Sequence, residues 1–219
     1  MTRYVENAEE AVLAAAKELL RKGLVEGTAG NLSARREDGS IVMTPSSVDY
    51  EEMTLEDLCI VDLDGEILSA KEGRNPTTEK ALHLACFKHF DDVGAVIHSH
   101  AVHASMFAVA RKPIPPCIDE FTIFVGGEVR VAEYGPSASD ELAEHAVAAL
   151  EDRGAVLLAN HGMVAVGPSP AKALHITALV ERTAEIVWGA HVLGPIHSLP
   201  EKVNRNFGNV YKYLRENPM

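Results

Sequence analysis

The chain has 219 residues, and its 20 basic and 32 acidic side chains give it a formal net charge of −12. Nucleic acids and anionic membranes attract concentrated Lys and Arg, so this balance argues against both as partners. Apolar residues make up 47% of the chain, which is enough to bury one full core, and we expect a single domain over residues 1–219.

The cysteines predict a reducing environment. Cys59, Cys86 and Cys117 are odd in number and stand in apolar surroundings, which favours core thiols over a disulfide framework. The first residues have no signal-peptide pattern, and no apolar run reaches the roughly 18 residues of a membrane span. We therefore expect a cytoplasmic protein.

Short apolar runs alternate with stretches of helical periodicity along the chain. In chain order, these patterns predict a helix at 6–22, strands at 41–43, 58–62 and 66–68, a helix at 77–90, a strand at 96–100, a helix at 101–110, strands at 122–125 and 129–132, a helix at 139–150, strands at 155–159 and 163–167, and a helix at 170–192. Thr77 or Thr78 is the expected N-cap of the second helix. Residues 203–219 form a short polar tail.

This alternation of helices and hairpin-joined strands is typical of an α/β protein. It predicts a three-layer α/β/α domain with a mostly antiparallel or mixed central sheet. A dinucleotide-binding Rossmann unit is not expected, because no GxGxxG follows the first strand.

Two of the predicted strands end in histidine. The run Gly94–Ile97 leads to His98 and His100, and because side chains alternate along a strand, both imidazoles leave the same face. A second run, Ala155–Ala159, leads to His161. Three such imidazoles would hold a divalent cation and leave one coordination position open, which is typical of catalytic zinc. The alternative is that these are ordinary histidines satisfied by hydrogen bonds.

Two further features have both a functional and a purely structural interpretation. The segment Gly27–Asn31 can offer backbone N–H groups to an anion, yet it lacks the lysine of a P-loop and can equally be a simple turn. Glu79 stands in the first turn of a predicted helix, where a carboxylate can carry out chemistry or merely complement the helix dipole. His83, like several other histidines, has no partner motif and is assigned no role.

Five motifs occur in the order seen in class II aldolases: Gly27–Ser33 (GTAGNLS), Thr44–Ser47 (TPSS), Pro76–Glu79 (PTTE), His98–His100 (HSH) and Asn160–Gly162 (NHG). By these motifs the chain resembles the class II aldolase/adducin superfamily, from the first helix to about residue 193. The resemblance implies the α/β/α fold of that family and a homotetramer with active sites between subunits. It also implies a metal-dependent aldolase that cleaves a ketose 1-phosphate into dihydroxyacetone phosphate and an aldehyde.

Carried over by motif, the resemblance implies a role for each matching residue. His98, His100 and His161 would be zinc ligands, and Mn²⁺ or Co²⁺ stay open because imidazole binds all three ions. Glu79 would be a displaceable fourth ligand and the catalytic base. The residues that would line the pocket for the substrate phosphate are Thr28, Asn31, Ser46, Ser47, Thr77 and Thr78.

Two positions depart from the family pattern. Ser47 stands where the phosphate loop of the family often has glycine. Counting back from Gly126-Gly127, Glu120 stands where aldolases of the family have a catalytic tyrosine. Glu120 is therefore a candidate second acid/base, with an exposed loop glutamate as the alternative. Tyr211 and Tyr213, in a tail expected near the active site, are possible replacements, and ordinary packing tyrosines are the alternative.

Two other functions remain open. Sugar-phosphate 4-epimerases, dehydratases and hydroxy-acid decarboxylases on the same scaffold share the metal site. Glu120 in place of a tyrosine slightly favours them, whereas Glu79 next to the paired hydroxyls of Thr77 and Thr78 favours the aldolase. A non-catalytic, adducin-like assembly domain is the second alternative. The intact set of His98, His100, His161 and Glu79 argues against it, because a scaffold has no physical need for an open metal site.

Overall fold

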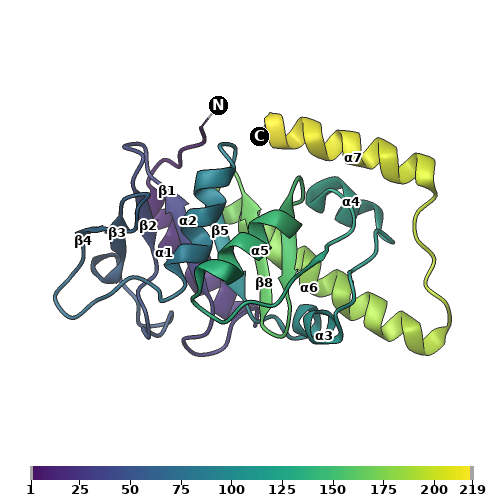
Figure 1. The fold of residues 1–219 in the computed structure, drawn as a ribbon, viewed down its shortest axis with the longest axis horizontal. Coiled ribbons are helices and arrows are strands. Elements are labelled where there is room, and N and C mark those ends of the chain that lie inside the picture. Colours follow the sequence, from purple (N-terminus) through teal and green to yellow (C-terminus); the bar gives the residue numbers. More distant parts are fainter. Residues whose placement is uncertain (1, 218–219) are drawn as a thin grey trace.

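The computed structural model describes residues 2–217, which form an eight-stranded sheet with helices on both faces (Figure 1). The strands are β1 (Asn31–Arg35), β2 (Ile41–Met43), β3 (Cys59–Val61), β4 (Ile67–Ser69), β5 (Ala95–Ser99), β6 (Val131–Ala132), β7 (Ala155–Leu158) and β8 (Gly162–Gly167). The helices are α1 (Ala8–Arg21), α2 (Lys80–His89), α3 (Val102–Ala110), α4 (Asp119–Val125), α5 (Asp140–Leu150), α6 (Pro170–Leu193) and α7 (Glu201–Glu216), with a 3-10 helix, η1, at Leu55–Asp57. Within the described residues, no helix combines the length and hydropathy that a membrane span requires.

The strands follow the order β4-β3-β2-β1-β5-β8-β7-β6 across the sheet. Neighbouring strands are antiparallel except for β6 and β7, which run parallel. At the centre, Asn31 of β1 pairs with His98 of β5, and Ser99 pairs with Met163 of β8. The mixed, mostly antiparallel sheet that the sequence predicts is confirmed. His98 lies in its central strand β5, His100 directly follows that strand, and His161 lies in the turn between β7 and β8.

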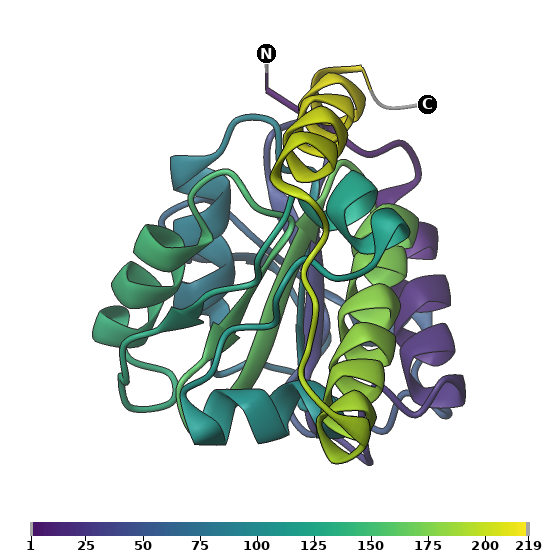
Figure 2. The same ribbon diagram turned by 90° about the vertical axis from the view of Figure 1, so that its right-hand side faces the viewer.

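Each face of the sheet buries its own apolar cluster, because alternate side chains of a strand point to opposite faces. On the face covered by α2 and α5, Val96 lies in one cluster with Leu82 and Leu142. On the face covered by α1, α3 and α6, Ile97 lies in the other cluster with Leu19. Figure 2 shows the resulting helix, sheet and helix layers, so the three-layer prediction is confirmed as well.

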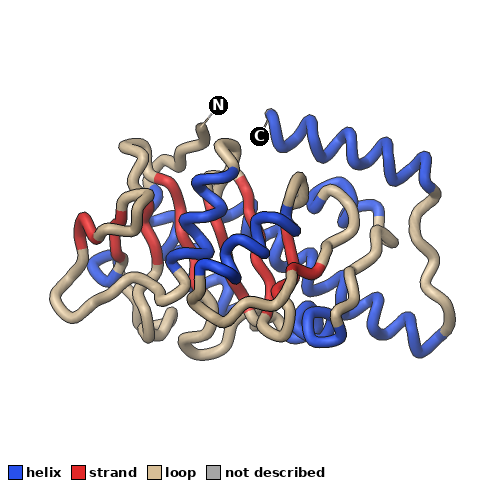
Figure 3. The backbone as a smooth tube through the Cα atoms, in the orientation of Figure 1, coloured by secondary structure: helices blue, strands red, loops and turns tan. Residues whose placement is uncertain are grey.

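One segment that the sequence predicts as a strand is helical. Residues 122–125 belong to α4, drawn as helix in Figure 3. Gly126 ends this helix at φ +97°, and its N–H donates to the carbonyl of Thr122. Asp119 and Glu120 in the first turn suit the positive end of the helix dipole. These end signals and tertiary packing outweigh the strand propensity of the apolar run, and the expected strand pair is wrong.

The C-terminal tail is also a helix, α7, which packs against α4 (Figure 1). The buried ring of Tyr211 lies over Gly126, where an added Cβ would be 2.7 Å from a ring carbon. Arg215 pairs with the carboxylate of Asp92 and donates to the Tyr211 hydroxyl at 3.0 Å. Asp92 precedes β5, whereas His98 lies near the other end of that strand. Within one chain, α7 therefore lies away from the histidines, and a tail near the active site stays a prediction.

Candidate active site

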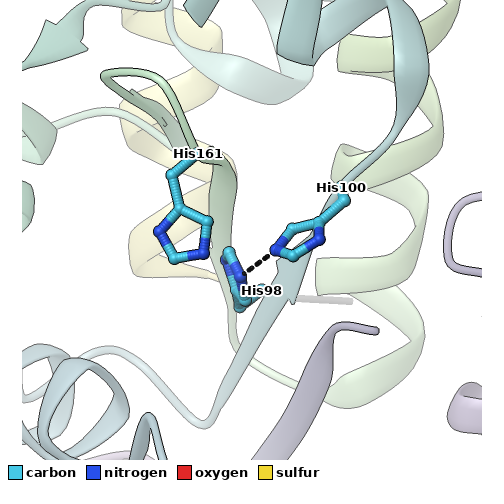
Figure 4. Close-up of side chains that lie close together, drawn as sticks. All are labelled: His98, His100 and His161. Carbon is cyan, nitrogen blue, oxygen red and sulfur yellow. Dashed lines mark hydrogen bonds between the residues drawn. The ribbon is translucent and has the colours of Figure 1, made fainter. Parts of the chain in front are cut away.

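The three histidines predicted as metal ligands come together at one end of the central strands (Figure 4). His98 and His100 lie at the end of β5, and His161 lies in the turn between β7 and β8. One ligand nitrogen from each residue lies within 4.8 Å of the others. Segments that are 61 or more residues apart in sequence thus supply one cluster, because β5 and β8 are antiparallel neighbours.

The turn that carries His161 explains the residues around it. Asn160 has φ +57°, a left-handed conformation that asparagine tolerates, and the guanidinium of Arg111 donates to its side-chain oxygen at 2.6 and 3.1 Å. At Gly162, an added Cβ would collide with the carbonyl oxygen of Ser99. Asparagine for the turn and glycine for the close approach place the imidazole between them against β5.

His98 is held in one tautomer by its second nitrogen. The side chain is completely buried, and Nδ1 lies 3.0 Å from the carbonyl oxygen of Met163. A carbonyl only accepts, so Nδ1 carries the hydrogen and Nε2 directs its lone pair at the other histidines. Burial lowers the pKa of His98 to about 3, so the ring is neutral at physiological pH. A neutral imidazole oriented by a backbone carbonyl is the form that binds metals.

The contact between His98 and His100 fits a bound cation. Their Nε2 atoms lie 2.8 Å apart, and burial together with the neighbouring His161 lowers the pKa of His100. Two neutral rings in this contact need either a hydrogen on the His100 nitrogen or a cation that accepts both lone pairs. Tetrahedral zinc, with Zn–N bonds of about 2.0–2.1 Å, separates its ligand nitrogens by roughly 3.3 Å. The cluster therefore fits an ion of this size with small side-chain movements.

Glu79 places a carboxylate between the imidazoles. Its Oε2 lies 3.1 Å from Nε2 of His98, and its Oε1 lies 3.4 Å from Nε2 of His161. The residue is only 6% exposed and is the N-cap of α2, which starts at Lys80 rather than at residue 77. The prediction of Thr77 or Thr78 as the N-cap is therefore wrong, although the Thr77 hydroxyl accepts the Glu79 backbone N–H at 3.2 Å just before the helix.

Hydrogen bonds keep the Glu79 carboxyl ionised. Burial raises the pKa of Glu79, but nearby His98, the Asn31 amide, His161 and the Ser137 hydroxyl outweigh it and hold that pKa below its usual range. Since His98 is itself neutral at physiological pH, the two hydrogen bonds matter most there. Asn31 donates to Oε2 and Ser137 donates to Oε1, each at 3.1 Å. Each carboxylate oxygen thus has one donor.

Two loops that carry predicted phosphate-binding residues contact each other. The Ser46 N–H donates to the Asn75 carbonyl at 2.8 Å, and the Thr77 N–H donates to the Thr44 carbonyl at 3.2 Å, so the TPSS and PTTE loops lie side by side. Ser47 has φ +60°, a left-handed conformation that favours glycine. This conformation is consistent with the glycine of the family pattern, and Ser47 adopts it here without one.

The other predicted phosphate-binding residues behave differently. Asn31 is buried, and its amide NH₂ group is directed at Glu79. Thr28 and Thr78 are exposed, and Thr28 lies in the turn where the Ala29 N–H donates to the Glu26 carbonyl at 2.9 Å.

The candidates for the second acid/base lie outside the cluster of this chain. Glu120 is exposed in the first turn of α4, with a carboxylate oxygen 4.0 Å from the guanidinium of Arg182. Tyr213 is 64% exposed on α7, and Tyr211 is buried in the contact with α4. Ser137, by contrast, touches Glu79, and sequence reasoning missed it because a serine in the loop before α5 belongs to no motif.

The chain has clear relatives among known proteins. Residues 10–188 match the family model described as the class II aldolase and adducin N-terminal domain. The chain is 31% identical over 209 residues to the 5-deoxy-D-ribulose 1-phosphate aldolase of Bacillus thuringiensis serovar kurstaki. This match covers 95% of this chain and 97% of that protein. It is 36% identical over 174 residues to the 5-methylthioribulose-1-phosphate/5-deoxyribulose-1-phosphate aldolase of Rhodospirillum rubrum, covering 80% of this chain and 77% of that protein.

A solved structure agrees with these relatives. An L-fuculose 1-phosphate aldolase has the same fold with a TM-score of 0.89 and 32% identity, covering 96% of this chain and 98% of that one. The family model, the relatives and the fold all agree with the resemblance carried by the five motifs. The chain therefore belongs to the class II aldolase and adducin family.

Proposed function

We propose that this protein is a metal-dependent aldolase that reversibly cleaves a ketose 1-phosphate, similar to fuculose 1-phosphate, into dihydroxyacetone phosphate and an aldehyde. The observation that carries the proposal is the carboxylate of Glu79 at 3.1 Å from His98 and 3.4 Å from His161. The site thus combines the two groups that this chemistry needs, a carboxylate base and three imidazoles that can hold a metal ion. The names of the relatives, which are aldolases of ketose 1-phosphates, support the substrate class.

A divalent cation held by His98, His100 and His161, zinc or else manganese or cobalt, would supply positive charge that stabilises the oxyanion formed as a carbon–carbon bond breaks. Cleavage breaks the C3–C4 bond, and the electron pair stays with C3. In synthesis, ionised Glu79 takes a proton from C3 of dihydroxyacetone phosphate, the electron pair on C3 forms the C3–C4 bond, and the second acid/base gives a proton to the aldehyde oxygen; the lowered pKa of Glu79 keeps its basic form available for this direction. Cleavage is the reverse: the second acid/base takes the C4 hydroxyl proton as the aldehyde forms, and Glu79 in its protonated form gives its proton to C3.

Neutral donors would hold the substrate phosphate. We assign this role to Thr28, Ser46, Ser47 and Thr78, with Thr77 shaping the loop. The TPSS and PTTE loops meet at the start of α2, where backbone N–H groups favour an anion. Asn31 is assigned to Glu79 instead, because its NH₂ group already faces the carboxylate.

The acid at the leaving oxygen would come from a neighbouring subunit of a homotetramer. Glu120 and Tyr213 are exposed and can reach another chain, whereas Tyr211 is held by Arg215 and is better explained as a packing residue. The free thiols of the cysteines support the cytoplasm as the location.

A retro-aldol assay tests the proposal. Zinc-loaded protein is incubated with a panel containing L-fuculose 1-phosphate, 5-deoxyribulose 1-phosphate and L-ribulose 1-phosphate, and released dihydroxyacetone phosphate is measured. We expect release that a chelator abolishes and that added zinc restores. If no substrate is cleaved while metal is bound, aldolase chemistry is rejected, and epimerase, dehydratase or decarboxylase assays with a Glu120→Gln variant follow. If no metal binds at all, an assembly domain becomes the better interpretation.

A further inference from the structure

One polar face of β1 packs on the segment formed by Glu79 and α2. Every second residue of a strand lies on one face, about 6.6 Å apart, and every fourth residue of a helix lies on nearly one face, about 6.0 Å apart. Because these repeats nearly match, successive residues of one strand face can meet successive turns of the helix. The contacting pairs are Asn31 with Glu79, Ser33 with His83, and Arg35 with Phe87.

His83 lies at the centre of this contact and is completely buried. Its Nδ1 lies 2.6 Å from the hydroxyl oxygen of Ser33, and its Nε2 lies 2.5 Å from the side-chain oxygen of Asn31. The Asn31 amide then donates to Oε2 of Glu79 at 3.1 Å. The four side chains form one continuous series of hydrogen bonds that ends on the proposed base.

One assignment of the hydrogens satisfies every member of this series. An ionised Glu79 only accepts, so it must face the NH₂ group of Asn31. The amide oxygen of Asn31 then faces His83 and only accepts, so Nε2 of His83 carries the hydrogen. Burial lowers the pKa of His83 to about 4, so the ring is neutral and Nδ1 accepts the hydroxyl hydrogen of Ser33.

The orientation of the Asn31 amide has to be fixed, because its oxygen and its NH₂ group have nearly the same shape. Packing alone does not choose between them, and a rotated amide would turn its oxygen toward the Glu79 carboxylate. The two oxygens would repel each other and displace the carboxylate from the histidines. A donor fixed at the far side of Asn31 prevents the rotation. The other donor to Glu79, Ser137, lies in an exposed loop and has no such support.

We propose that His83 is a positioning residue: with Ser33, it keeps the Asn31 amide turned toward Glu79 and so holds that carboxylate in place for proton transfer. The inference rests on the function proposed above for Glu79. His83 acts through Asn31, and within the described residues no hydrogen bond joins it to the three histidines or to the TPSS and PTTE loops. Its loss should therefore lower kcat more than it changes KM or zinc affinity.

The tautomer of His83 tests the orientation independently of turnover. In ¹⁵N-labelled protein, with and without zinc, we expect the His83 imidazole to carry its hydrogen on Nε2. In Ser33→Ala, the Nδ1 resonance should shift as its hydrogen bond is lost, with the tautomer unchanged. A hydrogen on Nδ1 in the parent protein would overturn the inference. This readout keeps its meaning even if no ketose phosphate is cleaved, so it separates failure of the inference from failure of the proposed function.

Kinetics test the consequence. For His83→Leu we expect kcat to fall about 10–100-fold, the range seen when a group that orients a site residue is removed, with little change in KM or zinc affinity. His83→Gln, whose amide can donate to Asn31, should recover most of kcat, and His89→Leu, an exposed change on the same helix, should match the parent. Parental kcat in folded His83→Leu, or equal losses in the Leu and Gln variants, would refute the role. If His83→Leu does not fold, His83→Met, which also has no donor for Asn31, replaces it, and parental kcat in folded His83→Met would refute the role equally.

Discussion

A polar cluster lies near each end of strand β5, and the two clusters pair their charged and hydrogen-bonding groups differently. At the end where β5 begins, Arg215 pairs with the carboxylate of Asp92, which precedes the strand, and donates to the Tyr211 hydroxyl. Near its last residue, the Nε2 atoms of His98 and His100 lie 2.8 Å apart beside the Glu79 carboxylate.

The difference separates a structural cluster from a functional one. In the Arg215 cluster, one positive and one negative group cancel, and the donors of the guanidinium have acceptors. In the histidine cluster, the acceptor Nε2 of completely buried His98 faces His100 and the Glu79 carboxylate, and such a buried acceptor is costly to leave unsatisfied unless a hydrogen on His100 or a cation faces it. The first arrangement attaches α7 to the domain, and the second is suited to bind a metal.

The largest expected effect comes from a substitution in the histidine cluster at the end of β5. Replacing Glu79 with Gln removes the proposed base but keeps the shape of the side chain, so kcat should fall about 10²–10⁴-fold. Zinc should stay bound, since three imidazoles remain. Steady-state kinetics with metal analysis on the same samples checks both points, and undiminished turnover would remove Glu79 from the mechanism.

The next largest effect comes from a substitution in the Arg215 cluster at the beginning of β5. Replacing Arg215 with Ala leaves the Asp92 carboxylate and the Tyr211 hydroxyl without their partner, and we expect a loss of about 1–3 kcal/mol in the free energy of unfolding. Urea denaturation measures it. Arg205→Ala, which removes an exposed pair with Glu201 on the same helix, is the control and should change little. A loss of zinc binding in Arg215→Ala would show that the two ends of β5 are not independent.

The pH dependence of the free energy of unfolding tests whether His83, which supports the functional end of β5 through Asn31, is neutral in the folded protein. Burial lowers its pKa from 6.5 to about 4, so between these values the unfolded chain binds a proton that the folded chain does not. Stability is therefore full above pH 6.5 and decreases as the pH falls toward 4. The loss from pH 7 to pH 5 should be about 2 kcal/mol for this group. Urea titrations of parent and His83→Gln at both pH values measure it, and equal pH dependence in both proteins would contradict the assignment.

The smallest effect concerns Tyr211. Replacing it with Phe keeps the ring over Gly126 and removes one hydrogen bond with Arg215, so stability should fall by about 1 kcal/mol. If the tyrosine only packs, kcat should stay at the parental value. A decrease of tenfold or more would return Tyr211 to the list of candidate acids.

Much of the fold could be predicted because its signals are local. Periodicity and turn residues predict the layers and the mixed sheet. They fail at α4, where an apolar run looks like a strand until Gly126 and the packing of Phe121 are considered. They also fail at α7, whose helix is stabilised by distant partners such as Asp92, and no local pattern reveals a partner 123 residues away.

The site shows the same division. His98 and His100 follow from strand alternation, and His161 follows from the second strand that ends in histidine. Ser137 reaches Glu79 only through the tertiary fold. His83 left a weaker signal, because it lies four residues after Glu79 and so one turn along the same helix face. Together with the alternation of Asn31 and Ser33 on one face of β1, this spacing indicates that His83 can contact both residues.

The central claim is that the histidine end of β5 binds a metal, and a zinc titration tests it most directly. Chelator-treated parent, His98→Ala, His161→Ala and the exposed control His89→Ala are titrated with Zn²⁺ by calorimetry. The account predicts about one ion per chain for the parent and the control, and loss of this binding in both site variants, because each loses one of three imidazole ligands. Equal zinc affinity in His98→Ala, His161→Ala and the parent would contradict it.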